Sequence, residues 1–179
     1  LDLIVPRGGE RLIDFVKKHA SCAVLISGRG NNFLYVSEKA DWSKAVNVII
    51  NAKTDKISGC NALDKVLINK NIAEYETKLK MLEQKLQQYK VEIVADDKVS
   101  KVLKDAATIT DNHIWYEEFL ALKLLIGEVE SLDEAIEMIN KYSGKHSAAI
   151  ITEDNSEALQ FMQNVDSAAV YHNASTRFT

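Results

Sequence analysis

Short apolar runs and amphipathic stretches alternate along most of this chain. The apolar runs are about four to eight residues long and rich in branched side chains, which is typical of buried strands. The first run, residues 1–5, stops at Pro6, the only proline. Further runs predict strands at residues 22–26, 33–36, 91–94, 119–126, 148–152 and 168–171, and residues 66–68 form another apolar run.

The amphipathic stretches between these runs predict helices. From Ile72 to Tyr89 the apolar residues stand alternately three and four positions apart, which places them on one face of a long helix. Asp41 is a suitable N-cap for a helix over residues 42–52. Other helices are expected at residues 10–19, 98–103, 133–142 and 156–165, with polar loops at residues 27–32 and 51–61.

The order of these elements predicts an α/β fold. Strands separated by helices form a mainly parallel sheet with helices on both faces, which is a three-layer α/β/α arrangement. In such sheets ligands bind beyond the carboxyl ends of the strands. We therefore expect the functional site of this chain at the carboxyl ends of its strands.

Composition narrows the possible partners. The chain has 22 Lys and Arg against 26 Asp and Glu, so it lacks the basic excess that nucleic-acid binding usually requires. Its longest apolar runs, such as residues 46–50, are far shorter than the roughly 18 residues that cross a bilayer. The four histidines lack the close spacing of a metal site. We expect a protein that binds no nucleic acid, membrane or metal ion.

The cysteine content predicts a reducing compartment. Cys22 and Cys60 are far apart in a chain long enough to bury a core without disulfides, so a cytoplasmic location is expected. The chain begins with Leu1, directly in strand-like residues and without the pattern of a secretory signal. The sequence is therefore expected to be an excised piece of a longer protein.

Cys60 is the strongest candidate for a reactive group. It lies in a polar loop with Lys53 and Lys56, and residues 61–65 after it are potentially helical. Ammonium groups and a helix N-terminus both stabilise a thiolate, which is the nucleophilic form of cysteine. The alternative is an unreactive cysteine that behaves as a small hydrophobic residue, and Cys22 fits that description better.

Two loops could bind anions. Arg7, Gly8 and Gly9 follow a strand and precede a helix, where backbone N–H groups can meet a phosphate, although a plain strand-to-helix turn explains them equally well. Residues 173–178 follow the last strand and combine one guanidinium with hydroxyl and amide groups. Such a loop suits a carboxylate or phosphate, and its alternative is a solvated terminus.

Several segments, taken in order, resemble one known family. They are residues 2–9, 51–54 with 59–63, 115–120, 131–136, 151–154, 165–168 and 173–178. Together they are similar to the gamma-glutamyl phosphate reductase family, also called glutamate-5-semialdehyde dehydrogenases, within the aldehyde dehydrogenase superfamily. The resemblance covers nearly the whole chain and is to the C-terminal, catalytic part of the family.

The resemblance implies an activity and a nucleophile. The family reduces L-glutamyl 5-phosphate to L-glutamate 5-semialdehyde and phosphate with NADPH, in proline biosynthesis. Cys60 stands at the position of the nucleophile that forms a thioester, and its backbone N–H would donate to the oxyanion. Glu118 matches the glutamate that binds the nicotinamide ribose, with Glu117 as the alternative in a register shifted by one.

The resemblance also assigns further sites and an organisation. It implies that residues 1–26 are a remnant of the NADP-binding domain or its junction, that residues 27–179 are the catalytic domain, and that the full-length protein is a homo-oligomer. Arg7, Gly8 and Gly9 match a turn near the cofactor phosphates. The residues expected to bind substrate are Asn61, Ser175, Thr176 and Arg177.

The chain departs from the family pattern in two loops. Residues 55–58 stand where the family commonly has arginine and proline, which weakens bidentate phosphate recognition there. Residues 27–30 replace a segment similar to His-Leu-Asp-Gly, so its contacts cannot be transferred. Two alternatives therefore stay open, which are a related aldehyde dehydrogenase with another substrate and a non-catalytic α/β binding module.

Overall fold

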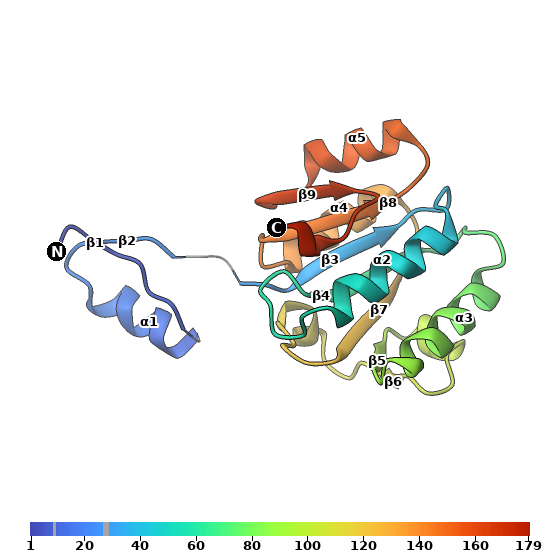
Figure 1. Cartoon of the computed structure of the whole chain (residues 1–179), viewed down its shortest axis with the longest axis horizontal. Helices are drawn as coiled ribbons and strands as arrows, with labels where there is room; N and C mark the ends of the chain where they lie inside the picture. Colours follow the sequence, from blue (N-terminus) through green and yellow to red (C-terminus); the bar gives the residue numbers. More distant parts are fainter. Residues whose placement is uncertain (9, 27–28) are drawn as a thin grey trace.

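The computed structural model describes residues 1–8, 10–26 and 29–179. Most of the chain forms a seven-stranded sheet in which every described pair of neighbouring strands is parallel (Figure 1). The strand order is β6-β5-β7-β4-β3-β8-β9. The strands are β3 (Asn32–Val36), β4 (Leu63–Asn69), β5 (Glu92–Ala95), β6 (Ala107–Thr108), β7 (Lys123–Val129), β8 (Ser147–Ile151) and β9 (Ala169–His172).

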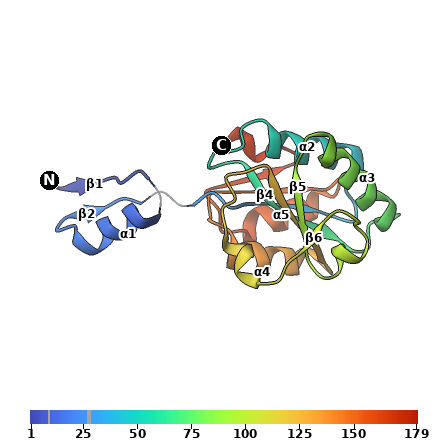
Figure 2. The same cartoon turned by 90° about the horizontal axis from the view of Figure 1, so that it is seen from below.

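Helices cover both faces of this sheet. Helices α2 (Trp42–Thr54) and α3 (Tyr75–Gln88) lie on one face, and α4 (Leu132–Tyr142) and α5 (Asn155–Asn164) lie on the other (Figure 2). The three-layer α/β/α fold expected from the sequence is confirmed. Neighbouring residues of a strand point to opposite faces, so Leu34 packs in the α2–α3 layer while Phe33 packs in the α4–α5 layer.

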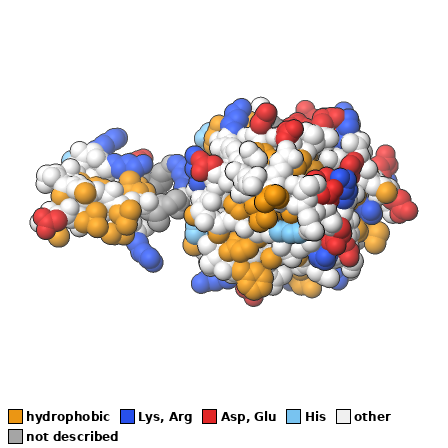
Figure 3. Space-filling view, turned by 90° about the horizontal axis from the view of Figure 1, so that it is seen from above, with side chains coloured by type: hydrophobic (Ala, Val, Ile, Leu, Met, Phe, Trp, Pro, Cys, Tyr) orange, Lys and Arg blue, Asp and Glu red, His pale blue; other side chains and the backbone are white. Residues whose placement is uncertain are grey.

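The first residues form a separate small unit. Strands β1 (Leu3–Ile4) and β2 (Ala23–Val24) pair in parallel, and α1 (Glu10–His19) connects them. Apolar side chains lie at the surface of this unit (Figure 3), and the exposed ones are Leu1, Leu3, Val5, Leu12, Phe15 and Leu25. The chain enters β3 at its amino end, so the small unit is on the side of the sheet where β3 begins (Figure 1).

Some predicted elements are wrong in type or extent. The expected strand at residues 119–126 begins only at Lys123, because residues 117–122 form an irregular segment instead. The potential helix after Cys60 is absent, since residues 63–65 already belong to β4. At residues 98–103 the chain forms one short 3-10 turn, Val99–Lys101. The turn at Gly9 and the loop residues 27 and 28 lie outside the described residues.

The pairing of β3 with β4 contains an irregularity. Asn32 is paired with Leu63, but the next residue, Phe33, is paired with Lys65, so Asp64 is an extra residue in β4. An extra residue of this kind is a β-bulge, which bends the strand and redirects side chains, and bulges are common next to active sites. Here the bulge comes directly after the loop that carries Cys60.

Candidate active site

Cys60 lies in a short turn that presents its side chain to solvent. Gly59 N–H donates to the Lys56 carbonyl at 3.2 Å, and Ala62 N–H donates to the Gly59 carbonyl at 2.9 Å. Cys60 is exposed and forms no disulfide. Cys60 is therefore accessible to a reactant.

Asn32, at the start of β3, holds the turn in place. Its side-chain amide donates to the Cys60 carbonyl at 2.8 Å and to the Ala62 carbonyl at 2.7 Å. Its Oδ1 accepts both the backbone N–H and the hydroxyl of Ser147, at 3.0 and 2.8 Å. Asn32 thus ties the turn to the amino ends of β3 and β8. Sequence reasoning missed this residue, and only its place directly before an apolar run could have drawn attention to it.

The group around Cys60 lies at the amino ends of the strands. Cys60 precedes β4, Asn32 opens β3, and Glu118 precedes β7. The expectation that the functional site lies beyond the carboxyl ends is therefore wrong for these residues. The rule for open α/β sheets concerns loops that follow strands, whereas the turn at Cys60 is the connection from α2 back into the sheet.

Glu118 meets the Cys60 turn at Gly30. The Gly30 N–H donates to the Glu118 carboxylate. A Cβ atom on Gly30 would collide with Glu118 Oε1 and lie 2.8 Å from the Cys60 carbonyl oxygen. Burial raises the pKa of the half-buried Glu118, and the nearby Asp64 carboxylate raises it further. By contrast, Glu117 is exposed and lies 3.7 Å from His113, so Glu118 is the one that faces the Cys60 turn.

We expect Gly30→Ala to destabilise the protein by about 1–3 kcal/mol, because the added methyl group overpacks a buried position against a carboxylate and a carbonyl. Urea unfolding measures the change. The double variant Gly30→Ala/Glu118→Ala removes one of the two obstructing groups and should recover part of the loss. An unchanged midpoint for Gly30→Ala would show that the contact at Gly30 is not formed.

The C-terminal segment packs against the other side of the Cys60 turn. Arg177 donates from Nη1 to Asn61 Oδ1 and from Nε to Asp55 Oδ2, the latter at 3.1 Å. A Cβ atom on Gly59 would lie 2.9 Å from Arg177 Nη1, so glycine at this position lets the guanidinium approach the turn. The structure therefore brings Arg177 and Asn61 together beside Cys60, and their expected role in substrate binding stays a prediction.

Ser175 and Thr176 are in the same segment but are both buried. Thr176 donates to the Asn61 carbonyl at 2.8 Å, and the Ser175 hydroxyl accepts the Arg177 N–H at 3.2 Å. These contacts are with the protein itself. In this structure the two hydroxyls shape the loop that holds Arg177.

Lys53 is not beside the thiol, contrary to the expectation from its position in the sequence. Its ammonium is fully buried and donates to the Leu63 carbonyl at 2.8 Å and to Asp64 at 3.1 Å. The potentially helical segment after Cys60 is strand, so no helix N-terminus faces the thiol. The expected contributions of Lys53 and of a helix N-terminus are therefore wrong, because α2 extends to Thr54 and points Lys53 into the core, while the expected contribution of the exposed Lys56 stays a prediction.

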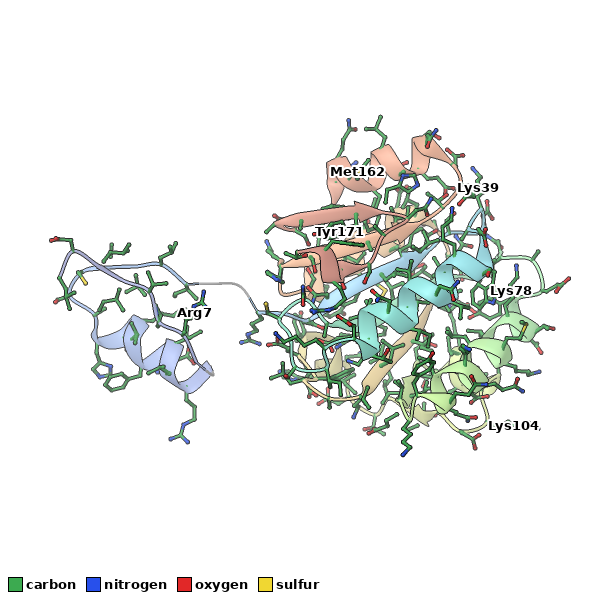
Figure 4. The ribbon with its side chains drawn as sticks, in the orientation of Figure 1. Arg7, Lys39, Lys78, Lys104, Met162 and Tyr171 are labelled. Carbon is green, nitrogen blue, oxygen red and sulfur yellow. The ribbon has the colours of Figure 1, made fainter. Side chains whose placement is uncertain are left out.

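Arg7 and Gly8 are not part of this group. Both are exposed on the small N-terminal unit, and Arg7 lies well away from the sheet (Figure 4). Gly9 lies outside the described residues. The structure thus gathers Cys60, Asn61, Glu118 and Arg177 but leaves the predicted phosphate-binding turn apart from them.

The described residues contain no group of three or more histidine, cysteine or acidic side chains arranged to hold a metal ion. Among the same residues no helix combines the length and apolar character that a membrane span needs.

Comparison with known proteins gives a consistent result. Residues 101–179 match the family model described as the aldehyde dehydrogenase family. The chain is 47% identical over 179 residues to the gamma-glutamyl phosphate reductase of Dictyoglomus thermophilum. It spans 42% of the length of that relative.

Solved structures show the same similarity in three dimensions. The crystal structure of gamma-glutamyl phosphate reductase from Thermotoga maritima superimposes with a TM-score of 0.94 and 44% identity, over 100% of this chain and 42% of that one. Glyceraldehyde-3-phosphate dehydrogenase GapN from Methanocaldococcus jannaschii, solved with NADP, superimposes with a TM-score of 0.76 and 18% identity. The alignment covers 100% of this chain and 47% of that one, and shows a shared fold.

Proposed function

Because this chain belongs to the aldehyde dehydrogenase family and is similar to gamma-glutamyl phosphate reductases over its whole length, we propose that it is the nucleophile-bearing part of an NADPH-dependent L-glutamyl 5-phosphate reductase. The observation that carries the proposal is the exposed Cys60, flanked by Glu118 on one side and Arg177 on the other. The whole enzyme acts in proline biosynthesis, in the cytoplasm, as a homo-oligomer.

Cys60 is the nucleophile in this proposal. Its thiolate attacks the acyl carbon of glutamyl phosphate, a carbon–sulfur bond forms, and the carbon–oxygen bond to the phosphoryl group breaks, so that inorganic phosphate leaves with the electron pair. Covalent capture replaces one difficult displacement with two easier steps. The Asn32 amide on the Cys60 carbonyl fixes the turn, which orients the Cys60 N–H toward the developing oxyanion.

Arg177 is the anion-binding group. Its side chain is mostly buried, with Nη1 on Asn61 and Nε on Asp55. Asp55 is well exposed and can swing into water, which frees one edge of the guanidinium for a substrate carboxylate or phosphate. Asn61 then orients the arginine, while Ser175 and Thr176 maintain the loop.

Glu118 is the cofactor-binding group. A half-buried carboxylate that already accepts the Gly30 N–H suits the two hydroxyls of a ribose as donors. When bound there, the nicotinamide would supply a hydride to the acyl carbon, and the aldehyde would leave as the carbon–sulfur bond breaks and the Cys60 thiolate is restored. In the full-length enzyme, residues 1–26 belong to the cofactor-binding domain, and Arg7, Gly8 and Gly9 approach the cofactor phosphates.

We expect Glu118→Gln to weaken NADPH binding about tenfold, because the amide is a poorer acceptor for ribose hydroxyls than the carboxylate. Nicotinamide fluorescence in the full-length protein measures the dissociation constant. Because burial raises the pKa of Glu118, binding should decline as the pH falls through that raised value. Glu117→Gln is the matched control and should bind NADPH as the unmodified protein does, since Glu117 faces away from the Cys60 turn.

The test of the proposed reaction is run in reverse with the full-length protein. We expect NADP-dependent oxidation of glutamate 5-semialdehyde only when inorganic phosphate is present, because phosphate is the group that releases the acyl chain from Cys60. Oxidation without phosphate would identify a hydrolytic aldehyde dehydrogenase. Absence of turnover, together with equally slow iodoacetamide labelling of Cys60 and Cys22, would identify a non-catalytic module.

A further inference from the structure

Two consecutive residues of the β4 bulge, Asp64 and Lys65, lie against the backbone on both sides of Glu118. The Lys65 ammonium donates to the Glu117 carbonyl at 2.7 Å and lies 3.7 Å from the centre of the Phe119 ring. The Phe119 N–H lies near the Asp64 carboxylate and lowers the pKa of that group. The carbonyl before Glu118 is therefore held by Lys65, and the amide after it faces Asp64.

The two residues that lie against this backbone are buried and charged. Asp64 and Lys65 are 2% and 0% exposed. Burying charges is unfavourable unless they are well paired, and apolar side chains could fill the same space. Lys53 pairs with Asp64 from α2, and the Phe119 N–H is a further favourable neighbour of the carboxylate. Because burying these charges is unfavourable, we expect Asp64 and Lys65 to have a functional role besides stabilising the fold.

The position of β4 next to the Cys60 turn indicates what this role is. The Cys60 turn leads directly into the bulge, and Asn32 ties that turn to the start of β3. The irregular segment that contains Glu118 has no strand or helix of its own to fix it. The contact from Lys65 and the nearby Asp64 therefore bear directly on the segment that carries the Glu118 carboxylate.

We propose that Asp64 and Lys65 are positioning residues that clamp the backbone at Glu117 and Phe119 and so hold the Glu118 carboxylate in place for the cofactor beside Cys60. The proposal depends on the proposed role of Glu118. It also explains why Glu118 faces the Cys60 turn and Glu117 faces solvent, because the clamp fixes the register of the segment.

The two charges act on Glu118 in opposite directions. The Asp64 carboxylate raises the pKa of Glu118, whereas the Lys65 and Arg29 cations lower it. The charged groups near Lys65 are Asp64 on β4, Lys53 on α2, Glu117 in the irregular segment and Lys123 on β7. Burial, the dominant effect, lowers the pKa of Lys65 to about 7.

The experiment uses Asp64→Asn and Lys65→Met in the full-length protein. Hydrogen exchange over residues 116–121 and the pH dependence of NADPH binding are the two measurements. For Lys65→Met we expect roughly tenfold faster exchange in this segment and about tenfold weaker NADPH binding, from loss of a charged hydrogen bond. Asp64→Asn keeps an acceptor for the Phe119 N–H, so its exchange should change less.

The pH dependence separates positioning from a structural role. Loss of the Asp64 charge lowers the pKa of Glu118. The acid limit, which is the pH below which NADPH binding declines, should therefore move to lower pH in Asp64→Asn. Loss of the Lys65 charge should move the limit to higher pH in Lys65→Met. Glu83→Gln is the matched control, because it changes a buried charged residue without touching the clamped backbone, and it should not speed exchange at residues 116–121.

The outcomes are distinguishable. If exchange over residues 116–121 stays unchanged in Lys65→Met and the acid limit stays unchanged in Asp64→Asn, the clamp does not exist. If Glu118→Gln binds NADPH normally while exchange still increases in Lys65→Met, the clamp is real but the proposed role of Glu118 is wrong. If Lys65→Met does not fold, Asp64→Asn decides through hydrogen exchange over residues 116–121 together with the acid limit, since it preserves size and one acceptor oxygen.

Discussion

Replacing Cys60 by alanine in the full-length protein is expected to lower kcat for phosphate-dependent oxidation of glutamate 5-semialdehyde by roughly 10⁴-fold or more. The loss is this large because Cys60 is the residue that forms the acyl intermediate in the proposed reaction. Asn61 and Arg177 beside Cys60 offer an amide and a guanidinium, neither of which is a nucleophile. Steady-state rates at saturating NADP and phosphate measure the effect.

Cys22→Ala is the matched control for this variant. Cys22 lies in the small N-terminal unit and precedes β2, so its removal should leave kcat unchanged. NADPH binding should also persist in Cys60→Ala, because the Glu118 carboxylate is held by Gly30 and not by the thiol. Substantial turnover by Cys60→Ala with normal phosphate dependence would refute the thioester route.

Lys53→Met is expected to destabilise the protein by about 3–5 kcal/mol at neutral pH, because it leaves the Asp64 carboxylate buried without its cation. The ion pair is almost fully enclosed, with Nζ and Oδ1 3.1 Å apart. Burial raises the pKa of Asp64, and Lys53 is the strongest influence in the opposite direction. Without Lys53 the pKa of Asp64 must rise further.

The sign of the pH dependence follows from this shift. A carboxyl group whose pKa is higher in the folded state than in the unfolded state favours folding at low pH and loses that contribution as the pH rises through the interval between the two values. The destabilisation by Lys53→Met should therefore shrink as the pH falls from neutral toward the raised pKa. Urea unfolding of variant and unmodified protein across this range gives the difference.

A double variant provides the control for this effect. Lys53→Met/Asp64→Leu removes both charges and should recover most of the stability, since an apolar pair is often as stable as a buried ion pair. The same double variant should still bind NADPH poorly, because the introduced leucine side chain has no atom that can accept the Phe119 N–H. Equal destabilisation of Lys53→Met at all pH values would show that Asp64 is not the group left unpaired.

The alternation of apolar runs and amphipathic stretches is sufficient to predict the layers of the fold. Two features follow directly from the local periodicity of the sequence. One is the burial of branched residues in β3, and the other is the apolar face of α3, which carries Leu79, Leu82 and Leu86. Part of the segment 117–122 reads as strand because Phe119 and Leu120 are apolar. In the structure Phe119 packs beneath the Lys65 ammonium instead of in the sheet.

The candidate site is only partly predictable from the sequence, because its contacts join residues from separate elements. Cys60 and Glu118 can be chosen by residue type and resemblance, but the contacts between them run through Gly30, Asn32 and Asp64, which come from separate elements. These contacts depend on the bulge in β4, and nothing in residues 61–65 distinguishes a bulged strand from the helix that their composition allows. The end of the sheet at which the group lies is likewise fixed by tertiary structure.

The bulge in β4 also determines which changes the Cys60 region can accept over evolutionary time. Because successive side chains of a strand alternate between faces, removing or adding one residue in β4 before Val66 would change the faces of the first strand residues relative to the core residues that follow. Substitutions in this stretch alter one contact at a time, whereas a single insertion or deletion alters all of them together. We therefore expect this stretch to tolerate substitutions better than a change of length.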